Sequence, residues 1–152
     1  MSLTVVAPVA GRIVRLSDVP DPVFSAALVG PGVAIDPAQR GRGHAVAPID
    51  GTIAKLHPHA YVITSDDGAG VLVHLGIDTV QLAGKGFELL ADETSTVAAG
   101  DPIVAWDPAA VVAGGRSPIC PIVALDAPAS ALSGLSEDGD VAAGETLFTW
   151  ER

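Results

Sequence analysis

Short runs in which apolar and polar residues alternate make up most of the chain, and clusters of Gly, Pro, Asp and Ser separate them. A period of two predicts β-strands that bury one face, joined by tight turns. Two stretches are exceptions. Pro20–Gly30 has apolar residues on one side of a helical projection, and Asp126–Gly134 has a proline that a first helical turn accepts. We therefore predict an all-β protein with one or two short helical turns, and only strands and turns elsewhere.

One pair of predicted strands also carries candidate chemistry. The runs His59–Thr64 and Val71–Val80 are rich in apolar and β-branched residues, and Ser65–Gly70 between them consists largely of turn residues. Two such runs predict a hairpin or a similar antiparallel pair. This arrangement can bring His59 and His74 face to face, with little else nearby that titrates. Two facing imidazoles can carry a phosphoryl group, hold a metal ion, or have no function beyond structure.

The chain contains two internal repeats. Val6–Leu16 returns as Val46–Leu56, both with the pattern Ala-Pro-x-x-Gly, and Val97–Asp107 returns as Val141–Glu151, both with Val-Ala-Ala-Gly. Each copy is a turn followed by a short alternating strand. A solenoid needs at least about three stacked repeats, so two copies of each unit predict an internal pseudo-duplication instead. We see no linker or break in composition, which predicts one domain over residues 1–152.

Composition and charge exclude several classes of function. The 152 residues are 49% hydrophobic and 17% charged, which argues against disorder. The formal net charge of -10 argues against a nucleic-acid partner and favours a neutral or basic protein partner. Cys120 is the only cysteine, so no disulfide can form within the chain. Neither a signal peptide nor a membrane-spanning segment is visible, and we expect a cytoplasmic protein without membrane insertion.

Five short motifs occur together along the chain: Ala7-Pro8-x-x-Gly11, Pro20-Asp21-Pro22-Val23-Phe24, Ala47-Pro48-x-x-Gly51-Thr52-Ile53, His59-Ala60 and Val73–Val80. In combination they resemble the glucose-type enzyme IIA of the bacterial sugar phosphotransferase system. The similarity extends over nearly the whole chain, and the H-L-G-I-D-T-V stretch is its most specific part. Biotinyl and lipoyl carrier domains use similar Ala-Pro-x-x-Gly turns, but Lys55 and Lys85 lack the neighbours that a carrier lysine needs.

The resemblance implies an antiparallel β-sandwich, barrel-like in form, with a shallow apolar depression around the two histidines. Such domains accept a phosphoryl group from a histidine-containing phosphocarrier protein and pass it to a cysteine of a IIB domain, which drives sugar uptake. By motif position, His74 is the phosphorylated residue and His59 its facing partner. In the family a backbone carbonyl, here that of Gly76, binds the δ nitrogen and leaves Nε2 as the nucleophile. His59 could donate a hydrogen bond to a phosphoryl oxygen, so no cofactor is required.

Further residues match positions on the family's docking face for partner proteins. An apolar face would exclude water, protect the phosphohistidine and admit an apolar partner surface. Asp21 and Asp78 are expected to meet arginines of the donor protein, although an Asp in the place of Asp78 often only caps a turn. Phe24 and Leu28, at helical spacing, could equally belong to the core. The apolar docking positions are Val23, Phe24, Leu28, Val29, Leu72 and Val80.

One segment departs from the family pattern. The link before His59 is slightly shorter than the family commonly has, and His57 stands two residues before it, where relatives carry a threonine or a similar residue. The threonine hydroxyl orients the partner histidine in some relatives. Pro58 also stiffens the approach to His59. The role of His57 and Pro58 beside the histidine pair is therefore open.

The sequence can also be compared with two other functions. A zinc-dependent hydrolase of related β architecture needs three protein ligands, and Pro48 stands where a motif beginning at His44 would require an aspartate. A regulatory binding module is compatible with the carrier role, because phosphorylation adds about two negative charges to an apolar face and so can change its regulatory targets. His59 and His74 could also share a weakly bound zinc ion that a partner's carboxylate completes.

Overall fold

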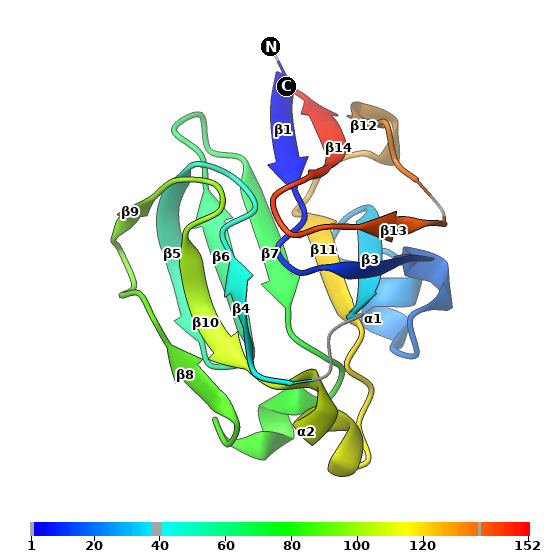
Figure 1. The fold of residues 1–152 in the computed structure, drawn as a ribbon. Coiled ribbons are helices and arrows are strands. Elements are labelled where there is room, and N and C mark those ends of the chain that lie inside the picture. Colours follow the sequence, from blue (N-terminus) through cyan, green and yellow to red (C-terminus); the bar gives the residue numbers. More distant parts are fainter. Residues whose placement is uncertain (1, 38–40, 137) are drawn as a thin grey trace.

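Antiparallel strands dominate the computed structural model, which describes residues 2–37, 41–136 and 138–152 (Figure 1). They form an eight-stranded sheet of order β13-β2-β3-β11-β7-β6-β5-β9 and two three-stranded sheets, β1-β14-β12 and β4-β10-β8. Within the described residues none of the sheets closes into a barrel. The predicted all-β antiparallel class is confirmed. The strands are β1 (Ser2–Val6), β2 (Gly11–Arg15), β3 (Gly32–Pro37), β4 (Gly43–Val46), β5 (Gly51–His57), β6 (Ala60–Thr64), β7 (Gly70–His74), β8 (Phe87–Leu89), β9 (Thr96–Val97), β10 (Pro102–Trp106), β11 (Cys120–Ala124), β12 (Leu132–Ser133), β13 (Asp140–Val141) and β14 (Thr146–Glu151).

The two early repeats meet through their turns. The N–H of Val6 donates to the carbonyl of Pro48 at 2.9 Å, and the N–H of Val46 donates to the carbonyl of Pro8 at 3.0 Å. Each Ala-Pro-x-x-Gly turn thus satisfies the backbone of the other. This reciprocal pairing is what a local two-fold pseudo-symmetry produces.

The late repeats complete the same symmetry. Gly144 N–H donates to the carbonyl of Ala7 at 2.8 Å, and Gly100 N–H donates to the carbonyl of Ala47 at 2.9 Å. Strand β13 pairs with β2 and strand β9 with β5 in matching register. Strands β14 and β10 likewise pair with β1 and β4. The chain therefore contains an outer unit (β1, β2, β13, β14) and an inner unit (β4, β5, β9, β10), and the predicted pseudo-duplication is confirmed.

The first predicted helical turn is present as helix α1 (Pro22–Ser25). Asp21 begins it, because its Oδ1 accepts a hydrogen bond from the N–H of Val23 at 2.9 Å, and proline is well suited to the first helical position. The second predicted turn is only a single 3₁₀ turn, η3 (Ala129–Ala131). Two further 3₁₀ turns are η1 (Leu16–Asp18) and η2 (Thr79–Leu82).

The expectation of only strands and turns elsewhere is wrong at helix α2 (Pro108–Ala113). Six residues are too few to show helical periodicity against a background of alternating strands. Asp107 caps this helix through Oδ1, which accepts from the N–H of Ala109 at 2.9 Å, and Pro108 follows it. The same Asp-Pro dipeptide begins α1, and this repeated capping signal could have identified α2.

A large apolar core joins both units, and a smaller cluster lies beneath α1. The large core contains the buried side chains of Tyr61, Trp106 and Phe148. None of the helices in the described part of the chain has the length and apolarity to span a membrane. The smaller cluster, called the Phe24 cluster here, consists of Val14, Leu16, Val19, Phe24, Ala34, Ile77 and Val123.

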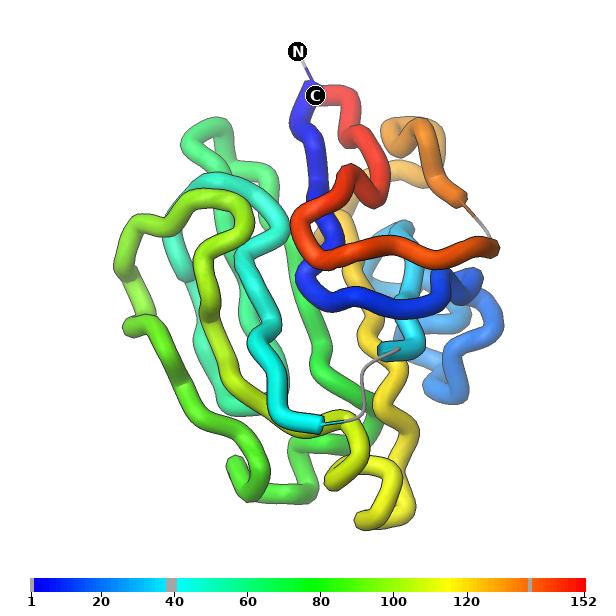
Figure 2. Tube along the Cα trace, in the orientation of Figure 1, coloured from blue at the N-terminus to red at the C-terminus, as the bar shows by residue number. Residues whose placement is uncertain are grey.

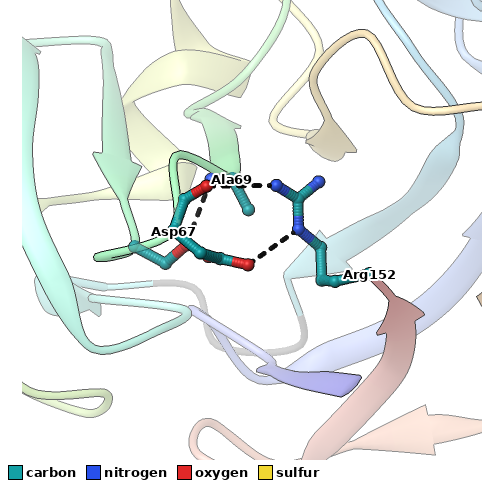
Figure 3. A network of polar contacts seen from close by, with 4 residues as sticks. Asp67, Ala69 and Arg152 are labelled. Carbon is teal, nitrogen blue, oxygen red and sulfur yellow. Dashed lines mark hydrogen bonds and ion pairs between the residues drawn. The ribbon is translucent and has the colours of Figure 1, made fainter. Parts of the chain in front are cut away.

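The β6–β7 hairpin is tied to the last strand of the fold. Arg152 donates from Nε to Oδ2 of Asp67 at 3.0 Å and from Nη2 to the Asp67 carbonyl at 3.4 Å (Figure 3). The Ser65 hydroxyl and the Arg152 guanidinium together lower the pKa of Asp67. The guanidinium also lies 4.9 Å from the ring centroid of Trp150. These contacts hold the turn of the hairpin beside β14, whose end lies next to the start of β1 (Figure 2).

Candidate active site

The two candidate histidines lie at the end of the hairpin opposite to its turn. His74 is the last residue of β7 and pairs with Ala60, the first residue of β6. Leu75 N–H donates to the carbonyl of His59 at 2.7 Å, which extends the pairing by one step. The His59 and His74 ring centroids are consequently 5.3 Å apart, with an interplanar angle of 69°. The predicted hairpin is confirmed, and it does bring the two imidazoles together.

The His74 ring is held by the backbone carbonyl of Gly76. Its Nδ1 lies 2.6 Å from that oxygen. Because a carbonyl oxygen only accepts, the contact requires the proton to be on Nδ1. The other ring nitrogen, Nε2, then carries a free lone pair, as a nucleophile needs.

Gly76 presents its carbonyl because the chain leaves the strand immediately after His74. Its φ of +82° lies in the left-handed region, and a Cβ there would lie 2.7 Å from Cγ2 of Thr79 and 2.9 Å from the carbonyl oxygen of Ser117. The apolar run beyond His74 therefore does not continue the strand. It folds into a loop and then into η2, which begins at Thr79.

Thr79 is a structural element of this loop to which the sequence analysis gave no role. It is buried, and its hydroxyl donates to the carbonyl of Leu75 at 2.7 Å. Ile77 N–H donates to the carbonyl of Ser117 at 2.9 Å, which ties the loop to the segment before β11. A threonine hydroxyl often bonds the carbonyl four residues before it, so the Leu-x-x-x-Thr spacing was the available signal.

Burial makes both imidazoles favour the neutral form. The pKa of His74 is lowered by desolvation, which outweighs the opposing effects of the Gly76 carbonyl, Asp21 and Asp78. The pKa of His59 is lowered by desolvation and by the proximity of His74 and His57. Both rings are therefore neutral at neutral pH, and an unprotonated Nε2 on His74 is available to react.

The two acidic residues predicted to bind a partner flank His74 in different ways. Asp21 is half-buried and caps α1, so it has a structural role whether or not it also meets a partner. Asp78 is exposed and precedes η2 with a φ of +59°, but its side chain makes no capping bond there. Its backbone forms the turn while its carboxylate faces solvent. Both carboxylates raise the pKa of His74 and so stabilise positive charge on its ring.

The apolar docking positions fall into two groups. Phe24 is only 6% exposed and belongs to the core, and its ring lies edge-on to His74 with centroids 5.2 Å apart. Val29 and Leu72 are half-buried and pack against the same cluster. By contrast Val23, Leu28 and Val80 are 44%, 70% and 59% exposed, so the core alternative is correct for Phe24 and wrong for Leu28.

His57, where the sequence departs from the family pattern, adds a third ring beside the His59 and His74 rings. His57 ends β5 and pairs with Ala60 across a tight turn. Its ring stacks on that of His59, with centroids 5.7 Å apart and an interplanar angle of 25°. Three of the chain's four histidines thus lie in one row. The fourth, His44, is exposed on β4.

The described residues do not fit a resident zinc ion. They contain no group of three or more His, Cys, Asp or Glu side chains placed to hold a metal. The facing pair offers two nitrogens, whereas a catalytic zinc normally takes three protein ligands. Cys120 is buried and contributes none, because burial raises the pKa of its thiol to about 12. The arrangement required by a zinc hydrolase is therefore missing from this part of the chain.

Acidification is expected to destabilise the fold through the two partly buried imidazoles. Because the pKa values of His59 and His74 are lowered in the folded state, the unfolded chain binds more protons below about pH 6.5. The free energy of unfolding should be highest above that pH and fall as the pH drops toward the folded pKa values. Urea unfolding at about pH 7.5 and 5.5 measures this loss. A His59→Gln/His74→Gln double variant should lose part of the pH dependence, whereas a His44→Gln control should keep it; equal pH dependence in all three proteins would contradict the assignment.

Comparison with known proteins places this geometry in a family. The family model described as "phosphoenolpyruvate-dependent sugar phosphotransferase system, EIIA 1" matches residues 3–129. The glucose-specific EIIA component of Staphylococcus aureus (strain COL) is 36% identical over 146 residues, which are 95% of this chain and 86% of the relative. That of Staphylococcus epidermidis (strain ATCC 12228 / FDA PCI 1200) is 37% identical over 124 residues, 80% of this chain and 73% of the relative.

A solved structure agrees with the sequence matches. The glucose permease IIA from Mycoplasma capricolum superposes with a TM-score of 0.89 and 32% sequence identity, and the match covers 98% of this chain and 96% of that one. None of these relatives is described as a hydrolase, so the zinc-hydrolase alternative has no support. The chain belongs to the glucose-type EIIA family of the phosphoenolpyruvate-dependent sugar phosphotransferase system.

Proposed function

We propose that this chain is a cytoplasmic phosphoryl carrier that takes its phosphoryl group from a histidine-containing phosphocarrier protein and passes it to a cysteine of a IIB domain. The observation that carries the proposal is the 2.6 Å contact between His74 Nδ1 and the Gly76 carbonyl oxygen. The His59 ring lies beside the His74 ring that is held in this way. Membership of a phosphotransferase family supports it independently. Each transfer exchanges one bond to phosphorus for another, and no cofactor is required.

In the accepting step, the lone pair of His74 Nε2 attacks phosphorus while the bond to the carrier's histidine nitrogen breaks. The ring of His74 gains positive character during this step. The Gly76 carbonyl, Asp21 and Asp78 all raise the pKa of His74, which means that they stabilise this charge. They are in place before the reaction, so no reorganisation of solvent is needed to supply them.

In the donating step, a cysteine thiolate of the IIB domain attacks phosphorus and the electron pair of the Nε2–P bond returns to the His74 ring. His59 is neutral and keeps one ring N–H, which can donate to a phosphoryl oxygen. This donation stabilises the charge that spreads over the phosphoryl oxygens in the transition state. His59 therefore acts as an electrostatic catalyst rather than as a nucleophile.

The exposed apolar side chains around His74 form the proposed docking face. Val23 and Leu28 lie in the α1 region, and Val80 lies on η2. Asp21 and Asp78 add negative charge beside them and would attract a basic surface on the donor. Phosphorylation adds about two negative charges to this face, so free and phosphorylated forms are expected to bind different regulatory targets. A zinc ion on His59 and His74 would likewise need a ligand from a partner.

The test of the proposal is a labelling experiment with purified components. Incubation with phosphoenolpyruvate, enzyme I and the histidine phosphocarrier should add one phosphoryl group, in an acid-labile and alkali-stable linkage. Intact-mass measurement gives the stoichiometry, and addition of a IIB domain should remove the label. Omission of the phosphocarrier is the control. A chain that stays unlabelled in the complete mixture is not a phosphoryl carrier of this system.

Substitution of His59 with alanine is expected to separate the two steps. His59→Ala retains the nucleophile and its carbonyl contact, so it should still accept a phosphoryl group from the phosphocarrier. Donation to the IIB domain should slow by about 10²- to 10³-fold, the usual cost of losing one preorganised hydrogen-bond donor to a developing charge. Rapid-quench measurement of both steps, with His44→Ala as the matched control, tests this. Donation at the wild-type rate would remove His59 from the mechanism.

A further inference from the structure

The His74 and His59 rings are held in different ways. The His74 ring has a hydrogen bond from Nδ1 to the Gly76 carbonyl. By contrast, no hydrogen bond within the described residues reaches a ring nitrogen of His59. That ring contacts His74 on one side and His57 on the other. These two ring contacts can therefore restrain its orientation where no hydrogen bond does.

The backbone that carries the His57 ring is restrained. Its strand is anchored one residue earlier, where the N–H of Leu56 donates to Oε2 of Glu93 at 3.0 Å. The backbone of His57 pairs with Ala60, and Pro58 between the two stacked histidines has a φ fixed by its own ring. The backbone on both sides of the stack is thus restrained. The His57 side chain itself is exposed and has no other role in the proposed site.

The angles between the ring planes show how the three rings are oriented relative to one another. His57 lies nearly parallel to His59, at 25°, and His59 is turned to 69° from His74. A parallel neighbour limits rotation of the His59 ring about its side-chain bonds, because rotation would break the stacked contact. The edge of His59, where its ring N–H lies, is thereby kept at a constant angle relative to the His74 ring.

We propose that His57 is a positioning residue for phosphoryl transfer, whose stacked ring holds His59 in the orientation needed to donate to the phosphoryl group on His74. The role of His59 in this inference rests on the proposed carrier function. His57 itself does not touch the reacting atoms. What matters is a flat ring at this position, and neither the charge of His57 nor its hydrogen-bonding capacity is needed.

Two substitutions separate the ring from the other properties of residue 57. His57→Phe keeps a flat ring and removes both nitrogens. His57→Val removes the ring without adding a hydroxyl of the kind that orients this histidine in relatives. Valine is a residue type that β-strands favour, so β5 should still form. An aromatic pair contributes enough to orientation for its loss to matter by about threefold to tenfold. We expect His57→Val to slow donation to the IIB domain by about that factor, with acceptance unchanged, and His57→Phe to donate within about twofold of wild type.

A spectroscopic readout tests the stack without any phosphoryl transfer. In NMR spectra of the unphosphorylated proteins, the His59 ring protons should lose their ring-current shift in His57→Val and keep a shift of the same sign in His57→Phe. His44→Val is the matched control and should change neither measurement. If wild-type protein accepts no phosphoryl group, the carrier function fails, while the NMR comparison still decides whether His57 orients His59.

Two outcomes would overturn the inference. One is donation at the wild-type rate by His57→Val with an unchanged His59 ring spectrum. The other is equal slowing in His57→Val and His57→Phe, which would show that an imidazole nitrogen is required and that the flat ring is not enough. Rescue by phenylalanine alone, together with the retained ring-current shift, supports positioning by the stack.

Discussion

Replacing His74 with alanine is expected to abolish phosphoryl labelling of the chain. The described site contains one imidazole whose Nδ1 is bound by a carbonyl, and this contact is what frees Nε2 to attack. His59 does not substitute for it, because no hydrogen bond within the described residues selects its reactive nitrogen. Intact-mass measurement after incubation with phosphoenolpyruvate, enzyme I and the phosphocarrier should show the unmodified mass in His74→Ala and one added phosphoryl group in wild type.

The matched control for this experiment is His44→Ala, which removes an exposed imidazole on β4. It should label at the wild-type rate. NMR of the labelled wild-type protein should place phosphorus on Nε2 of His74, with Nδ1 still protonated. Full labelling of His74→Ala, or phosphorus on Nδ1, would refute the assignment of the nucleophile.

Replacing Gly76 with alanine is expected to have the second largest effect, on stability and on transfer together. The new Cβ would lie 2.7 Å from Thr79 Cγ2 and 2.9 Å from the Ser117 carbonyl, and the φ of +82° would itself be strained. Left-handed strain costs about 1–2 kcal/mol. Forcing extra volume into the packed loop adds about 1–3 kcal/mol. Any shift that relieves the clash moves the carbonyl away from His74, so labelling should also slow. Urea unfolding and the labelling rate measure the two effects.

Gly86→Ala separates the backbone strain from the clash. Gly86 has a φ of +86°, close to that of Gly76, but a Cβ there meets nothing within 4 Å. This variant should lose only the strain contribution of about 1–2 kcal/mol and should label normally. If both variants lose the same stability, the contacts with Thr79 and Ser117 do not restrict residue 76. If Gly76→Ala labels at the wild-type rate, its carbonyl does not need a fixed position.

Features that depend on a repeating pattern could be predicted from the sequence. Alternation and turn residues identified the β6–β7 hairpin and hence the meeting of His59 with His74. The repeated turn motifs identified the pseudo-duplication. The Gly76 carbonyl was also predictable as a partner of the His74 ring, because a glycine two residues after a histidine can bring its carbonyl close, whereas the choice of Nδ1 followed from the family resemblance.

Features that depend on short local chemistry or on side-chain packing were missed. Helix α2 has six residues, and only its Asp-Pro cap marks it. The run after His74 is as apolar as a strand, yet it turns away because Thr79 bonds back to Leu75 and Gly76 adopts a positive φ. The hydrophobic periodicity of the sequence does not reveal either effect. The stacking of His57 on His59 depends on side-chain orientations across a turn, which the order of residues alone does not specify.

The nesting of one repeat unit inside the other has a consequence for how the chain folds. Strands of the inner unit lie between residues 43 and 106, whereas the outer unit joins β1 to β14 across nearly the full length of the chain. Closing a longer loop costs more chain entropy, although the cost grows only slowly with length. The inner unit and the histidine hairpin thus have the lower entropic barrier and can order first. Pairing of β1 with β14 closes the longest loop, so we expect it to form after the hairpin that carries His59 and His74.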